Sequence, residues 1–197
     1  MITTYVREAL ENEAKALAEL SRSAGGEYEQ AVKLISGCEG KVVVSGIGKS
    51  GHVGKKIAAS LSSTGTPSFF VHAAEAVHGD SGMIEPRDVV ILLSNSGETL
   101  EVLNVLAIVE KIGSKRIAIT KNPDSTLAKR CDVALTYRYD SEADHLGLAP
   151  TTSALLQLAI GDALAVTLSR LKGFTKEQFH LYHPGGSLGK QLSEEKK

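Results

Sequence analysis

Asp88-Val89-Val90-Ile91-Leu92-Leu93 runs directly into Ser94-Asn95-Ser96-Gly97-Glu98-Thr99, and this stretch decides the fold. Its first half is an apolar run with the length of a buried strand, and its second half opens an amphipathic pattern that continues to Gly113. A strand that is covered on both faces of a parallel sheet has such a continuous apolar run. The stretch therefore predicts a strand–turn–helix unit in an α/β fold.

Apolar runs and helical patterns alternate on both sides of this unit. We expect strands over 41–46, 68–71, 88–94, 116–120 and 132–137, and helices over 2–22, 28–35, 50–63, 99–112, 125–130 and 151–171. This alternation predicts an α/β fold with a single doubly wound parallel β-sheet, flavodoxin-like or Rossmann-like, with helices on both faces. Residues 1–40 are expected to form helices that pack on the core, 41–190 the main domain, and 191–197 a charged tail.

The turn after the central strand is rich in hydroxyl groups. Ser94, Ser96 and Thr99 stand within six residues, at the point where a helix is expected to begin. The first N–H groups of a helix have no partner within the helix and face the positive end of its dipole, so hydroxyls added there form a phosphate site. Asn95 is expected to contact the ligand too. No Walker lysine follows, which excludes a nucleotide P-loop. The alternative is an ordinary helix N-cap with a capping box.

A second glycine-rich turn follows the first expected strand. Gly46-Ile47-Gly48-Lys49-Ser50-Gly51 fits the dinucleotide fingerprint, which also needs an acidic residue at the end of the next strand. That strand ends in His72, and no acid follows before Glu75. We therefore favour a second phosphate or sugar turn over a nicotinamide site, and we expect no cofactor. Its contacts would come from Gly48, Lys49 and Ser50.

Composition narrows the classes of partner and location. The net charge is −1, which favours neither nucleic acid nor a membrane surface as a partner. We find no apolar run with the length of a membrane span, and Met1–Thr4 does not begin a signal peptide. Cys38 and Cys131 are far apart and lack metal-site spacing. Free thiols in a reducing cytoplasm are therefore expected.

Several segments, taken in order, resemble the sugar isomerase (SIS) domain, specifically the arabinose-5-phosphate isomerase family. They are Gly46–His52, Ser63–His72, His78-Gly79-Asp80, Ser94–Glu98, Leu146–Thr151 and His183-Pro184-Gly185-Gly186, and the match runs from about residue 5 to 190. The resemblance implies interconversion of D-arabinose 5-phosphate and D-ribulose 5-phosphate, a step that supplies Kdo for lipopolysaccharide. It also implies a cytoplasmic tetramer and no organic cofactor.

One feature departs from this family, and two other functions stay open. Most members carry a pair of CBS modules after the SIS domain, whereas this sequence ends soon after Gly189-Lys190, either as a natural short form or as part of a longer chain, so regulation through CBS modules stays open. Another sugar-phosphate isomerase, such as a hexulose-phosphate isomerase, is one alternative. A non-catalytic sugar-phosphate-binding regulator is the other, but residues 1–40 lack the basic recognition face of a DNA-binding segment.

Aldose–ketose isomerisation needs ring opening, removal of a C–H proton beside the carbonyl, and stabilisation of an enediol. Carboxylates and histidines suit the proton transfers, and a cation suits the oxyanion. The resemblance adds weight to five catalytic candidates: Lys49, His78, Glu101, Glu142 and His183. Each also has a structural alternative: a solvated lysine, a hydrogen-bonded histidine, a carboxylate at a helix dipole, or a surface charge.

Three further expectations concern assembly and ligands. Helix 151–171 has apolar residues on most faces, which indicates a central helix or a subunit interface, and we expect a homo-oligomer, most simply a tetramer. His183 is then expected to reach a neighbouring subunit's site. No metal is required, although His78 and His183 could bind an adventitious ion if they converge. A nucleotide-linked Kdo sugar is a candidate feedback ligand.

Overall fold

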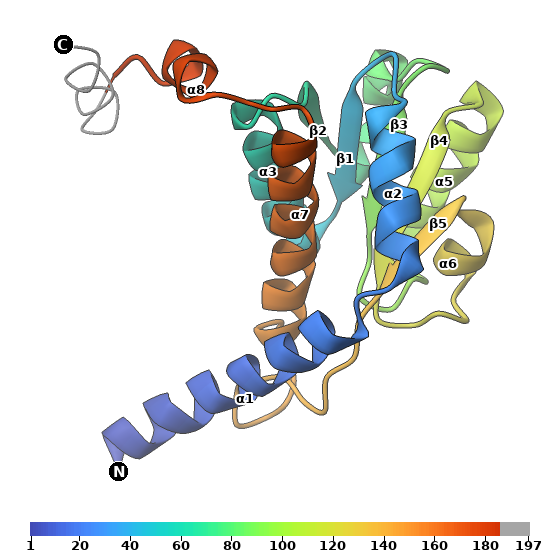
Figure 1. The fold of residues 1–197 in the computed structure, drawn as a ribbon. Coiled ribbons are helices and arrows are strands. Elements are labelled where there is room, and N and C mark those ends of the chain that lie inside the picture. Colours follow the sequence, from blue (N-terminus) through green and yellow to red (C-terminus); the bar gives the residue numbers. More distant parts are fainter. Residues whose placement is uncertain (186–197) are drawn as a thin grey trace, which may run out of the picture.

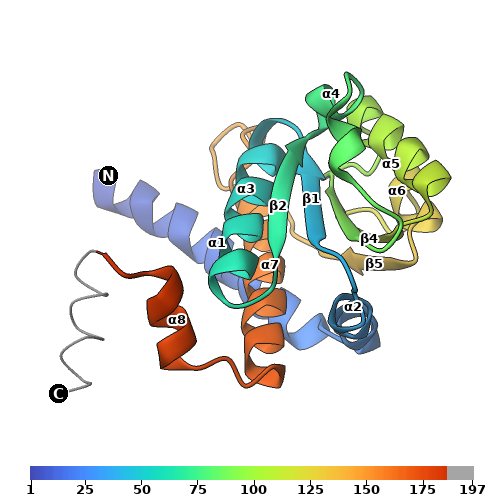
Figure 2. The same ribbon diagram turned by 90° about the horizontal axis from the view of Figure 1, so that it is seen from above.

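The computed structural model describes residues 1–185 as a five-stranded sheet with helices on both faces (Figures 1 and 2). The expected tail over 191–197, the last residues of the expected main domain and Gly186 lie outside the described residues. All neighbouring strands are parallel, in the order β2-β1-β3-β4-β5. The strands are β1 (Val42–Gly46), β2 (Ser68–His72), β3 (Val89–Leu93), β4 (Lys115–Thr120) and β5 (Val133–Thr136).

Alternate residues of the central strands face two separate apolar cores. Val44, Ile91 and Leu93 pack toward one face, whereas Val90 and Leu92 pack toward the other. Because both faces are covered, every residue of β1 and β3 is buried, as their apolar runs predict. The first face carries α1 (Ile2–Ser23), α2 (Gly26–Ser36), α3 (Gly48–Ser63) and α7 (Thr152–Leu171); the second carries α4 (Ala73–Ala76), α5 (Leu100–Ile112) and α6 (Thr126–Arg130).

The strand order reverses between β1 and β3. From β1 the chain passes through α3 to β2 on one side, and β3 leads through α5 to β4 on the other side. In open parallel sheets, ligands bind outside the carboxyl ends of the strands at such a reversal point. Both glycine- and hydroxyl-rich turns, 46–51 and 94–99, follow these two strands. The fold therefore brings the two turns together.

Most expected elements are confirmed, and the differences lie in short segments. Helix α3 begins at Gly48, two residues before the expected start. A 3₁₀ turn, η1 (Asp80–Met83), and a short helix, α8 (Lys176–Tyr182), were not expected. Helix α8 has no buried residue and begins with a capping box at Thr175, so local capping, and not an apolar face, accounts for it.

Helix α7 corrects the expectation that no apolar segment of the sequence has the length of a membrane span. Its 20 residues, with a mean hydropathy of 1.4 over the best window, are long and apolar enough to cross a membrane by length and composition. No other helix among residues 1–185 passes that test. The core helix of a soluble protein passes it as well, and α7 buries Leu156, Ile160, Leu164 and Leu168 against the sheet and α3. Its length is thus weak support for a membrane span.

The close packing of α3 on α7 explains an interior glycine. A Cβ atom at Gly161 would lie 2.3 Å from Cγ1 of Ile57, so only glycine allows this approach. The contact holds the middle of α7 close against the middle of α3.

Candidate functional site

A cavity of about 280 Å³ opens at the reversal point of the sheet. Three helices, α3, α5 and α7, begin around it, because each follows the carboxyl end of a strand or a loop beside one. The lining residues are Ile47, Lys49, Ser50, Asn95, Ser96, Thr99, Pro150, Ser153, Ala154 and Gln157. The structure thus brings five of the eleven sequence-predicted site residues to one cavity: Lys49, Ser50, Asn95, Ser96 and Thr99.

The hydroxyls of the turn after β3 form one cluster. Ser94 Oγ lies 2.8 Å from Thr99 Oγ1 and 3.5 Å from Ser96 Oγ, and it accepts a hydrogen bond from the Gly97 N–H at 3.0 Å. Gly97 has φ +71°, and a Cβ there would lie 2.1 Å from Ser125 Oγ, so the turn requires glycine. Ser94 is buried behind the cavity wall, and Ser96 is exposed at its mouth.

The two helices that follow the turns begin without a side-chain cap. Neither Ile47 at the start of α3 nor Thr99 at the start of α5 accepts a capping hydrogen bond in the described part of the chain. Helices α4, α6 and α8 are capped by His72, Ser125 and Thr175, whereas α1, α2 and α7 also begin without an N-cap side-chain hydrogen bond. Thr99 uses its hydroxyl on Ser94, so the ordinary N-cap alternative does not describe this turn. Two helix starts with open N–H groups therefore face one cavity, which is the geometry of an anion site.

Lys49 provides the positive charge of the cavity. It lies in the first turn of α3, is exposed, and has no ion-pair partner among residues 1–185. Its ammonium group is therefore free to attract a phosphate or an oxyanion. Gly48 precedes it with φ +59°, outside the set of lining residues.

Glu142 is buried and holds the start of α7. Its Oε2 accepts hydrogen bonds from the backbone N–H groups of Thr151 at 2.9 Å and Ser153 at 3.1 Å, and Tyr139 donates to its Oε1 at 3.1 Å. Burial alone would raise the pKa of this carboxyl, but the hydrogen bonds from Ser153, Thr151 and Tyr139 outweigh burial and hold it below its usual range. A carboxylate bound this way is a weak base.

Glu101 has different surroundings. It lies half-buried in the first turn of α5 and has no hydrogen-bond or ion-pair partner in the described part of the chain. Its neighbour Glu98 accepts from the Thr126 N–H at 2.7 Å, which lowers the pKa of Glu98 and gives it a structural role. Of the carboxylates near the turn, Glu101 is thus the one with free lone pairs. It is not among the residues that line the cavity in this single chain.

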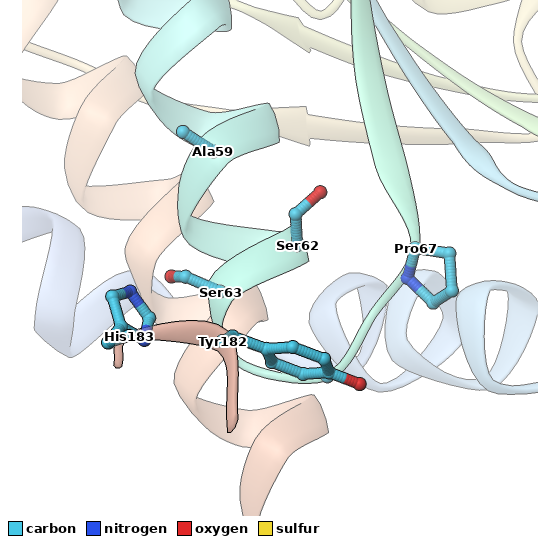
Figure 3. A pocket seen from close by; sticks show the side chains of 7 residues that line it. Ala59, Ser62, Ser63, Pro67, Tyr182 and His183 are labelled. Carbon is cyan, nitrogen blue, oxygen red and sulfur yellow. The ribbon is translucent and has the colours of Figure 1, made fainter. Parts of the chain in front are cut away.

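The two histidines lie at opposite ends of the sheet. His78 is exposed in the turn after α4, which follows the carboxyl end of β2. His183 lies at the end of α8, stacks on Phe179 with 4.0 Å between ring centroids, and lines a separate cavity of about 570 Å³ beside Pro67, which precedes β2 (Figure 3). The two side chains do not converge in one chain, and no group of three or more His, Cys, Asp or Glu residues in the described ranges could hold a metal.

A row of polar side chains lies behind the cavity, and of its members the sequence predicted only Asn95 and Glu142 as site residues. The Asn95 side chain faces two tyrosines: its Oδ1 accepts a hydrogen bond from the Tyr137 hydroxyl, and its Nδ2 donates one to the Tyr139 hydroxyl. Gln157 of α7 donates to the Tyr137 hydroxyl at 2.9 Å. A signal for Gln157 exists in the sequence, since it is a polar residue within the most apolar helical pattern of the chain. The tyrosines gave no such signal, because aromatic residues are usual near strand ends.

Known proteins match the chain over most of its length. The Escherichia coli O6:H1 protein named arabinose 5-phosphate isomerase KpsF is 50% identical over 192 residues, which are 97% of this chain and 59% of that protein. The E. coli K12 arabinose 5-phosphate isomerase KdsD is 49% identical over 94% of this chain and 57% of its own length. The chain thus spans less than two thirds of the curated relatives that it matches.

A solved structure also matches this chain in sequence and in fold. An E. coli CFT073 protein, solved in complex with arabinose 5-phosphate, is 48% identical and superposes with a TM-score of 0.90 over 93% of this chain and 97% of that one. A profile of the SIS domain family matches residues 35–167, which include β1 to β5 and most of α7. The chain belongs to the SIS domain family.

Proposed function

We propose that the chain is an aldose–ketose isomerase that interconverts D-arabinose 5-phosphate and D-ribulose 5-phosphate through an enediol. The observation that carries the proposal is the cavity at the sheet reversal, where two uncapped helix starts, a hydroxyl cluster and Lys49 meet. The names of the relatives and the sugar-phosphate complex of the E. coli CFT073 protein support this substrate.

In the proposed mechanism, the phosphate end of the substrate binds between the starts of α3 and α5. Ser50, Ser96 and Thr99 donate to it, while buried Ser94 orients Thr99. After ring opening, Glu101 removes the proton from carbon 2 of the aldose, and Lys49 stabilises the enediolate oxygen. Protonation at carbon 1 then gives the ketose. His78 and His183 are the candidates for proton transfer during ring opening.

We assign Glu142 a positioning role. Its oxygens accept from the first N–H groups of α7 and from Tyr139, so it holds Ser153 in place on the cavity wall. This role differs from proton abstraction, because a carboxylate with a lowered pKa holds a proton poorly.

A panel of phosphosugars tests the proposed reaction. We expect turnover of D-arabinose 5-phosphate and D-ribulose 5-phosphate, and much slower turnover of D-ribose 5-phosphate and 3-hexulose 6-phosphate. Faster conversion of the hexulose phosphate would favour the alternative isomerase. Binding of phosphosugars with no turnover of any would instead favour a regulator.

The hydroxyls of Ser94, Ser96 and Thr99 form what we call the cup, and substitution of one of them tests the proposed phosphate position. We expect Ser96→Ala to raise KM about 10-fold and to lower kcat less, because phosphate contacts stabilise ground state and transition state alike. Steady-state kinetics measure both constants. Ser36→Ala, an exposed serine at the end of α2 near the opposite edge of the sheet, is the matched control and should leave both unchanged. A fall in kcat with unchanged KM would contradict this position.

We propose that the chain assembles into a homo-oligomer, most simply a tetramer, in which His183 completes the site of a neighbour. Two observations support it: His183 is remote from the cavity of its own chain, and α1 extends away from the body with apolar residues exposed (Figure 1). The exposed residues are Ile2, Tyr5, Val6 and Leu10.

Mixed oligomers test the shared site. If His78 and His183 serve one site from different subunits, chains with His78→Ala and chains with His183→Ala should regain up to about a quarter of the activity when mixed, since a fraction of sites then holds both histidines. Activity of re-associated mixtures measures this. A monomer at micromolar concentration by light scattering, or mixtures without regained activity, would contradict a shared site.

We further propose a place in Kdo supply in the cytoplasm, with a nucleotide-linked Kdo sugar as a competitive feedback ligand. The anion cavity supports the feedback ligand, because it suits an acidic sugar. The two free cysteines support the cytoplasm, because thiols stay reduced there. Competition predicts that the cytidine-linked sugar raises KM and leaves kcat unchanged. Inhibition that lowers kcat alone would contradict it.

A further inference from the structure

Five side chains form a continuous hydrogen-bonded row that runs from Glu142, at the N-terminus of α7, to the cavity wall. Their order is Glu142, Tyr139, Asn95, Tyr137 and Gln157. The distances along the row are 3.1, 3.1, 2.9 and 2.9 Å. The two tyrosine rings stack with 6.3 Å between centroids. Asn95 and Gln157 are the members that also line the cavity.

The charge of Glu142 fixes the direction of every hydrogen bond in this row. An ionised carboxylate only accepts, so the Tyr139 hydroxyl donates its one proton to Glu142. The Tyr139 oxygen therefore accepts from Asn95 Nδ2, and Asn95 Oδ1 must face Tyr137. The Tyr137 hydroxyl donates to that oxygen, so its own oxygen accepts from Gln157 Nε2.

This polarity leaves Gln157 Oε1 as a buried acceptor without a donor. Gln157 is 1% exposed, and Oε1 has no hydrogen-bond partner among residues 1–185. A buried acceptor without a donor is unfavourable, so such an atom requires a functional explanation. The hydroxyls of Ser45 and Thr152 are buried and unpartnered too, but neither residue lines the cavity.

We propose that Gln157 is a specificity-determining residue, whose Oε1 accepts a hydrogen bond from one hydroxyl of the bound sugar phosphate. The proposal rests on the proposed function. A phosphate dianion offers no proton to an acceptor, so Gln157 serves the polyol part of the ligand. The cavity then has two ends. Lys49 and the hydroxyl cup bind the phosphate at one end, and Gln157 accepts a hydrogen bond from a sugar hydroxyl at the other.

Calorimetry with a non-reacting ligand tests this contact. The probes are D-arabinitol 5-phosphate, three analogues that each lack the hydroxyl at carbon 2, 3 or 4, and inorganic phosphate. Gln157→Met removes the acceptor at similar volume. We expect it to weaken arabinitol 5-phosphate binding about 10–100-fold and phosphate binding by less than about twofold. One of the three analogues should bind native and variant chains with the same Kd.

The analogue series distinguishes a direct hydrogen bond between Gln157 and the sugar from a purely structural role of Gln157. A purely structural role predicts that Gln157→Met weakens all four sugar ligands by a common factor, and this result would overturn the inference. Equal binding by native and variant chains would overturn it too. Tyr137→Phe, which removes the partner of Nε2 and leaves Oε1, is the control and should affect the four sugars equally. If the Met variant does not fold, Gln157→Leu replaces it.

Turnover of D-arabinose 5-phosphate by the native chain is a separate measurement. If the native chain turns over the substrate but Gln157→Met binds the sugar ligands as the native chain does, the inference is refuted and the proposed isomerase stands. Gln157-dependent binding without turnover would refute the proposed isomerase and leave the inference standing. No binding of any sugar ligand would overturn both.

Discussion

We expect Glu101→Gln to lower kcat about 10²–10⁴-fold with little change in KM. The substitution keeps the shape of the side chain and removes its basicity. Glu101 lies at the start of α5, next to the cup, and no described residue occupies its oxygens, so in the proposed mechanism the substitution removes proton transfer. Steady-state kinetics, together with incorporation of solvent deuterium at carbon 2, measure the effect. The two rates should fall in parallel.

Glu98→Gln is the matched control for this result. Glu98 lies three residues before Glu101, in the turn that precedes α5, and carries the same charge, but it accepts a hydrogen bond from the Thr126 N–H at the start of α6. Its replacement should lower stability slightly and leave kcat within about twofold. Near-normal turnover by the Glu101→Gln chain would remove this carboxylate as the base.

We expect Glu142→Gln to lower the free energy of unfolding by about 2–4 kcal/mol at pH 7, because hydrogen bonds to a buried charge are lost. Glutamine presents an NH₂ group where Glu142 accepts from Thr151 and Ser153, so at least one donor at the start of α7 is left unpaired. Urea denaturation measures the difference. The favourable interaction with the α7 dipole is lost as well.

The lowered pKa of Glu142 adds a pH signature. Its carboxylate stabilises the fold fully above its unfolded pKa, near 4.5, and this contribution is lost as the pH falls through the lower folded pKa. The stability difference between native and Glu142→Gln chains should therefore shrink from pH 5 downward. A constant difference between pH 7 and pH 3 would show that Glu142 does not act as a carboxylate in the fold.

The sequence predicts the sheet and the hydroxyl-rich turn after β3 because both depend on local patterns. The apolar run of β3 and the hydroxyls that follow it are contiguous, and a parallel sheet brings its strand ends to one edge. The positions of the cup and the second turn at one edge thus follow from the sequence alone. The uncapped start of α5 cannot be predicted from the sequence, because threonine is a favourable N-cap residue. In the structure, however, the Thr99 hydroxyl bonds to Ser94 and does not cap the helix.

The rest of the site depends on contacts between distant residues. Asn95 meets Tyr137 and Tyr139 across more than 40 positions, and no sequence period reports such a pairing. Glu142 looks like a surface charge in a polar loop, and only the packing of that loop on α7 buries it. His183 lies far from the cavity of its own chain, so its role depends on assembly.

Nuclear magnetic resonance in D₂O tests the central claim most directly. The purified chain is mixed with D-ribulose 5-phosphate, and ³¹P and ¹³C spectra follow the products. We expect D-arabinose 5-phosphate with deuterium at carbon 2, formed at a rate that Glu101→Gln lowers about 10²–10⁴-fold. An unchanged ribulose 5-phosphate spectrum, with no deuterium exchange at saturating substrate, would contradict it.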